Sequence, residues 1–88
     1  MTEKINERVD VITIYRKAGA IVMPYKLRWN GREYKITTLG YHHKVKEGKT
    51  VVHVFSVSND ELAFRLRFNT DTLSWILEEV LDGNGATA

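Results

Sequence analysis

The sequence predicts an all-β domain, a six-strand antiparallel meander that curls into a small barrel. The first observation is a pair of alternating apolar and polar runs on either side of Asn30-Gly31, the strongest local signal for a β-hairpin. The second is that further alternating runs surround turn residues at 46–48 and at 59–60. The third is composition: the 88 residues are 43% apolar and include no cysteine, which predicts one domain without disulfides or thiolate metal sites.

The two ends of the chain lack a periodic pattern. Residues 1–7 are mostly polar and predict a flexible arm, and residues 83–88 predict a flexible tail. Between these ends, residues 8–82 form a single small β domain. Its first strand covers 9–15, which is rich in β-branched residues, and a turn at 16–20 follows it.

The central hairpin has strands at 21–29 and 32–38. Its Asn-Gly turn suits type I′ geometry, because both central residues of that turn need a positive φ. A two-residue loop sets Leu27 opposite Tyr34. The apolar faces of the two strands therefore meet, as the register requires.

The second hairpin turns at 46–48, where Gly48 suits the left-handed position of a bulged turn. This three-residue turn places Tyr41, and not His42, on the core side of the sheet. The central hairpin fixes the opposite alternation, so the strand between the two hairpins needs one extra residue. We expect that residue to form a β-bulge near Gly40.

The third hairpin turns at 59–60, and a two-residue loop there pairs Phe55 with Phe64. This register points Val52 and Val54 away from the core. A sheet that is apolar on both faces needs a cover, so we expect either the last segment or a second copy of the chain to lie over these valines.

The segment 72–81 fits two kinds of secondary structure. Leu77 and Val80 share a helical face, whereas Trp75 and Leu77 share one face of a strand. We expect the strand, preceded by a four-residue loop that pairs Leu66 with Trp75. The alternative, a C-terminal helix, gives an α+β fold.

Three segments, 24–36, 64–68 and 75–80, resemble a family of small bacterial β domains of unknown function. Members share a Trp-x-Gly-Arg-x-Tyr hairpin and a closing Trp-x-Leu strand, and some are encoded near translesion DNA polymerases. The resemblance implies a bacterial source and a strand at 75–80. It implies no active site.

Charge is distributed unevenly along the chain. Residues 16–49 hold nine basic and two acidic residues, whereas residues 50–88 hold two basic and six acidic ones. Small barrels bind single-stranded nucleic acid with basic curved sheets, because cations follow the phosphates while aromatic rings stack on bases. In the competing interpretation these charges only solvate the sheet and protect its edges. The candidate nucleic-acid-binding residues are Lys26, Arg28, Lys35, Tyr41, His42, Lys44, Lys46 and Lys49.

The alternative function is a protein-interaction or dimerisation module that uses the apolar sheet face of Val52 and Val54. The partners expected from the sequence are therefore single-stranded nucleic acid, a second copy of the chain, or another protein. Salt-sensitive oligonucleotide binding would favour the first hypothesis, and a salt-insensitive dimer would favour the second.

The sequence indicates no enzyme, no cofactor and no metal site. His42 and His43 point to opposite sides of a strand, so at most one of them can join His53, whereas a zinc site needs three or four ligands. No histidine has a predicted nucleophile or carboxylate beside it. The polar start and the lack of an apolar run of about 20 residues predict a cytoplasmic protein that contacts no membrane.

Overall fold

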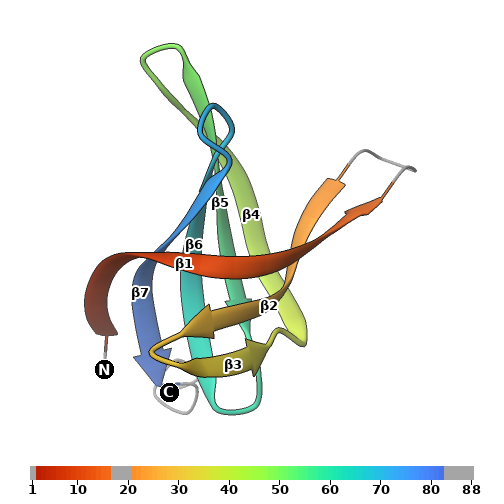
Figure 1. The fold of residues 1–88 in the computed structure, drawn as a ribbon, viewed down its shortest axis with the longest axis vertical. Helices are drawn as coiled ribbons and strands as arrows, with labels where there is room; N and C mark the ends of the chain where they lie inside the picture. The colour runs from red at the N-terminus through yellow and green to blue at the C-terminus, as the bar shows by residue number, and fades with distance from the viewer. Residues whose placement is uncertain (1, 17–20, 83–88) are drawn as a thin grey trace.

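A computed structural model describes residues 2–16 and 21–82, and every regular element in this part of the chain is a β-strand (Figure 1). The all-β prediction is confirmed. The strands are β1 (Thr2–Arg16), β2 (Ile21–Trp29), β3 (Arg32–Lys35), β4 (Thr38–Glu47), β5 (Thr50–Ser58), β6 (Leu62–Asn69) and β7 (Ser74–Asp82). In Figure 1 the β4–β5 hairpin and the far end of the β1–β2 hairpin project from the body in different directions.

The strands form one antiparallel sheet in the order β3-β2-β1-β7-β6-β5-β4. The first and last strands pair, as in a closing meander, but β3 and β4 form no ladder and the sheet stays open between them. Only residues 36 and 37 separate these two edge strands. The Ile36 N–H donates to the Tyr25 carbonyl (2.8 Å) and the Thr37 N–H to that of Ser58 (3.0 Å), so the chain bends sharply here. This bend divides one expected strand in two and raises the strand count from six to seven.

Strand β1 begins earlier than the sequence pattern indicates. Residues 2–7, expected to be a flexible arm, are already part of β1, and Thr2 to Val9 pair with β7. Backbone hydrogen bonds to β7 hold these residues, and such bonds need no alternation of apolar side chains in the sequence. Among residues 2–7 only Ile5 packs against the core, so the sequence pattern does not reveal the strand. The predicted tail at 83–88 and the tip of the turn at 17–20 lie outside the described residues.

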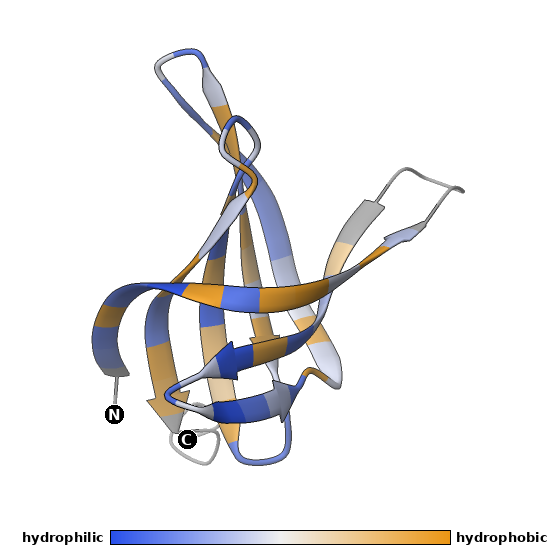
Figure 2. Cartoon of the chain, viewed as in Figure 1, coloured by the Kyte–Doolittle hydropathy of each residue, from blue (hydrophilic) through white to orange (hydrophobic). Residues whose placement is uncertain are grey.

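A single apolar core fills the concave side of the curled sheet. Figure 2 shows apolar and polar residues alternating along β1, as expected of a strand with one face on a core. The buried side chains come from four strands, β2, β5, β6 and β7. They are Leu27, Phe55, Val57, Phe64, Leu66, Trp75, Leu77 and Val80.

The central hairpin forms as predicted. Asn30 and Gly31 have φ values of 54° and 73°, which is the positive pair that a type I′ turn requires. Leu27 lies opposite Tyr34, and Trp29 lies opposite Arg32.

The loop of the second hairpin is one residue shorter than predicted. Gly48 has the expected positive φ (60°), but the loop holds only residues 48 and 49. The shorter loop shifts the register, so that His42 lies opposite Phe55 on the core side, while Tyr41 is 60% exposed. The prediction that Tyr41 faces the core is therefore wrong. The predicted bulge at Gly40 is confirmed, since Leu39 pairs with Val57 and Tyr41 pairs with Ser56.

The third hairpin has a four-residue loop instead of the predicted two-residue loop. The Asn59 side-chain oxygen accepts hydrogen bonds from the N–H groups of Glu61 and Leu62, both at 2.8 Å, and this closes the longer turn. Phe64 consequently lies opposite Val57 and not opposite Phe55. Because the shift is two residues, every side chain keeps its predicted face.

Strand β7 confirms the strand interpretation of the last segment. Its loop does contain four residues, but Trp75 pairs with Phe68, two positions away from the predicted Leu66. A bulge in β7 lets Leu66 pair with Leu77 while the preceding residue of β6, Arg65, pairs with Glu79. This extra residue turns both Leu77 and Val80 inward, and it explains why their spacing resembles a helical face.

Val52 and Val54 are buried, with 0% and 3% of their surface exposed. They lie in β5 between the two flanking strands, and Arg67 of β6 forms an ion pair with Glu47 of β4. Both charged side chains are on the same face of the sheet as the valines, so the pair crosses β5 above them. The two valines are therefore already buried within a single chain, without a second copy.

Candidate nucleic-acid interface

The structure separates the predicted basic residues into two groups. Lys26, Arg28 and Lys35 lie on the convex side of β2 and β3, because Leu27 and Tyr34 point into the core. Acidic side chains accompany them. Lys26 forms an ion pair with Glu33 at 3.8 Å, and Glu33 and Asp10 are the cross-strand neighbours of Arg28. These carboxylates weaken the positive potential of the convex side.

The second basic group lies on the projecting β4–β5 hairpin. Lys44 and Lys46 share the face of His42, and Lys49 is in the turn. All three lysines are exposed. Within the described ranges 2–16 and 21–82, no carboxylate lies within 4.0 Å of their ammonium groups. This group therefore keeps its positive charge for a ligand.

A row of rings crosses the sheet beside these lysines. Trp75 in β7 pairs with Phe68 in β6, Phe68 pairs with His53 in β5, and His53 pairs with Lys44 in β4. All four side chains are on the concave face. The ring centroids of Phe68 and Trp75 are 4.7 Å apart. The row thus connects the buried core to the charged edge strand.

His42 extends this row toward the core. Its ring stacks on Phe55 with a centroid distance of 4.4 Å and an interplanar angle of 4°. Its Nε2 lies 2.8 Å from Nδ1 of His53, a hydrogen bond in which one imidazole donates to the other. His53 is half-buried at the edge of the core, and Nδ1 is its ring nitrogen in this bond. We call His42, Lys44, Lys46, His53, Phe68 and Trp75 the rim surface.

Both histidines of the rim surface are harder to protonate than a free histidine. Burial lowers the pKa of His42 below 6.5, and the charge of Lys44 and the neighbouring His43 lower it further. Burial also lowers the pKa of His53, followed by the effects of His42 and Lys44. The two rings are therefore mostly neutral at pH 7, when they present flat, uncharged faces beside the lysines.

Tyr41 and His43 lie on the opposite face from His42. Their rings contact each other at 5.0 Å on the side of the sheet that carries Val54. Tyr41 therefore lies apart from the rim surface, and the structure does not place it with the other predicted binding residues. His43 also stays apart from the His42–His53 pair, as the alternation of side chains along a strand requires.

Three residues of the rim surface, His53, Phe68 and Trp75, are not among the binding residues predicted from the sequence. Their alignment depends on three successive strand registers, which the loops of three hairpins set. The available signal was the aromatic character of these residues on predicted inward positions.

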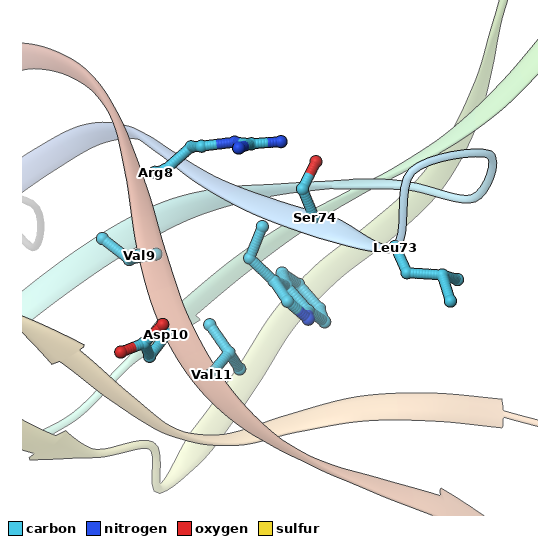
Figure 3. A pocket seen from close by; sticks show the side chains of 7 residues that line it. Arg8, Val9, Asp10, Val11, Leu73 and Ser74 are labelled. Carbon is cyan, nitrogen blue, oxygen red and sulfur yellow. The ribbon is translucent and has the colours of Figure 1, made fainter.

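An open cavity of about 430 Å³ lies at the Trp75 end of the row (Figure 3). Strand β1 forms one wall with Arg8, Val9, Asp10 and Val11. The other wall is formed by Leu73, in the loop before β7, and by Ser74 and Trp75 at the start of β7. Figure 3 shows Leu73 and Ser74 across the cavity from Val9 and Val11. The cavity thus continues the rim surface between β7 and β1.

Neither metal ligands nor membrane-spanning helices occur in the described part of the chain. No three His, Cys, Asp or Glu side chains among residues 2–16 and 21–82 are grouped to hold a metal ion. The same residues form no helix that is long and apolar enough to cross a membrane.

No family model, curated protein or solved structure matches the chain. The family resemblance noted from the sequence therefore stays a prediction. Function has to be argued from the geometry of the rim surface itself.

Proposed function

We propose that this chain is a non-enzymatic domain that binds single-stranded nucleic acid with the rim surface. The observation that supports this proposal is the cross-strand row of Lys44, His53, Phe68 and Trp75. Proteins that bind single strands combine a positive groove along the backbone with rings that stack on bases. Lys44, Lys46 and Lys49 supply the cations, and the half-buried rings of His53 and Phe68 supply the stacking faces.

The histidine pair fits a binding role better than a catalytic one. His42 Nε2 and His53 Nδ1 bond to each other, so each histidine uses one ring nitrogen to hold the other ring. A catalytic histidine instead orients a nucleophile or takes a proton from a substrate. The pair holds two flat rings in place beside Lys44, which is what a stacking surface needs.

The test is an anisotropy titration with a labelled oligothymidylate of about twelve nucleotides, within the usual site size of about 4–16 nucleotides. Measurements at about 50 and 200 mM salt give the slope of log K against log salt, near −0.7 for each phosphate contact. A duplex of equal length should bind more weakly, because its bases are stacked and unavailable. Absence of binding to the single strand at the lower salt concentration would reject the proposal.

Two charge-reversal variants locate the site. Lys44→Glu with Lys46→Glu removes two proposed contacts, so the salt slope should become shallower by about 1.4 and binding should fall steeply. Lys26→Glu with Lys35→Glu changes the net charge equally but on the convex side. It exchanges one like-charge cross-strand pair for another and removes the Lys26–Glu33 ion pair, so thermal unfolding must show that this control still folds. This control should keep most of the affinity. An equal loss in both variants would place the contact elsewhere.

A protein-interaction module is the second candidate, and a different surface supports it. Beyond Val9, β1 pairs only with β2, and this two-stranded ribbon exposes Ile12 (55%), Ile14 (40%) and Tyr25 (38%). Exposed apolar groups in such number are typical of contact surfaces. If light scattering shows a dimer that persists at high salt, Ile12→Lys should dissociate it.

A further inference from the structure

We propose that the cavity between β1 and β7 holds one unstacked nucleobase of the strand that the rim surface binds. This inference rests on the proposed function and adds a defined site for a single base. The cavity is open, has a volume of about 430 Å³ and combines apolar walls with polar groups at its margin. This volume lies within the range of about 300–1,000 Å³ that is usual for small-ligand sites.

The walls of the cavity suit a flat aromatic ring. Val9 and Val11 come from β1, and Leu73 lines the cavity from the loop before β7 (Figure 3). Trp75 lines the same cavity, although it is only 6% exposed, because its indole packs against Phe55 and Phe68. A base placed here would lie between Leu73 and the valines, in contact with the exposed part of the indole.

Leu73 is the residue that points most directly to a ligand. It is 72% exposed and has a φ of +56°, a combination that is unfavourable for a bulky apolar residue in water. The loop holds this conformation: the Leu73 N–H donates to the Asn69 carbonyl at 2.8 Å, and the Asn69 side chain accepts from Asp71 and Thr72. Strained residues that the surrounding structure fixes in this way are concentrated at ligand sites.

The cavity and the lysines lie along one path. Trp75 and Lys44 are the two ends of the row, three strand spacings apart, or about 14 Å at about 4.8 Å per strand. A single strand whose phosphates contact Lys44 and Lys46 can therefore extend over His53 and Phe68 toward the cavity. The bound nucleic acid would therefore follow the row, and one of its bases would reach the cavity.

The test uses Trp75 as a reporter. The chain has two tryptophans, so Trp29→Phe leaves Trp75 as the single tryptophan, and excitation at the red edge of tryptophan absorption avoids the four tyrosines. This variant is titrated with the oligothymidylate and with an abasic sugar-phosphate strand of equal length. Both strands should bind with the same salt slope, but only the strand with bases should quench Trp75, and it should bind at least about 5-fold more tightly.

The two proposals can fail separately. If the base-bearing strand binds more tightly than the abasic strand but Trp75 emission stays constant, the base site is wrong and the proposed function stands. If both strands bind equally well, both the base site and the stacking on His53 and Phe68 are wrong. If neither strand binds, both proposals fall.

A substitution at Leu73 separates ligand binding from folding. Leu73→Asn places a residue that tolerates positive φ in the strained position, so the thermal midpoint should rise by about 4–8 °C. The same variant should lose at least about 5-fold in affinity for the base-bearing strand and nothing for the abasic strand. Leu39→Asn makes the same chemical change near the start of β4, and it should leave both affinities unchanged. A Leu73→Asn variant that binds both strands as the wild type does would overturn the proposal.

Discussion

The covered face of β5 provides a direct test of the fold, because Val51 and Val52 are neighbours in sequence and point in opposite directions. Val52 is fully buried, whereas Val51 is 37% exposed. Val52→Ala removes two methyl-sized groups, worth about 0.8 kcal/mol each by transfer, and leaves a cavity below the Arg67–Glu47 pair. We expect a loss of about 2–3 kcal/mol in the free energy of unfolding. This is a large share of the about 4–13 kcal/mol typical for 88 residues.

The assay is urea and thermal unfolding of Val52→Ala beside Val51→Ala. The first variant should lower the thermal midpoint by about 10–20 °C. The second should cost less than about 1 kcal/mol, and any loss of strand propensity is common to both. Since the chain covers Val52 by itself, the midpoint should not change with protein concentration. Equal destabilisation by the two variants, or a midpoint that rises with concentration, would refute this account of the β5 face.

Two further predictions concern the central turn and the histidine pair. Gly31→Val should cost about 1–3 kcal/mol in unfolding free energy. The cost comes from backbone strain alone, because φ is +73° and an added Cβ meets no atom within 4 Å. Gly31→Asn should cost clearly less, and equal thermal midpoints for the two variants would contradict a type I′ turn. His42 and His53 have lowered pKa values, so the unfolded state binds more protons just below pH 6.5. Stability should be complete above pH 6.5 and fall as the pH decreases below it. His42→Phe keeps the ring on Phe55 and should flatten this dependence; an unchanged pH profile would show that the pair does not cause it.

The sequence alone determined the features that depend on neighbouring residues. Asn30-Gly31 specifies its turn because few other pairs accept two positive φ values, and the alternation on either side then fixes which residues of that hairpin face inward. The bulge at Gly40 lies where the sequence predicted it, but the argument for it placed Tyr41 on the core side, and the structure places His42 there instead. The lysines and histidines between positions 42 and 49 could also be identified as candidates from the sequence, because they are neighbours along the chain.

Only the tertiary structure decided how these parts meet. A loop shorter by one residue at Gly48 exchanged Tyr41 for His42 on the concave face, and the longer Asn59 turn moved β6 by two positions. Such choices depend on side-chain hydrogen bonds and packing across strands, which a single strand does not encode. The pairing of β1 with β7 joins the two ends of the described chain and places Val9 beside Trp75. The row from Lys44 to Trp75 exists because three successive hairpins align four consecutive strands, and the alternation within one strand does not contain that information.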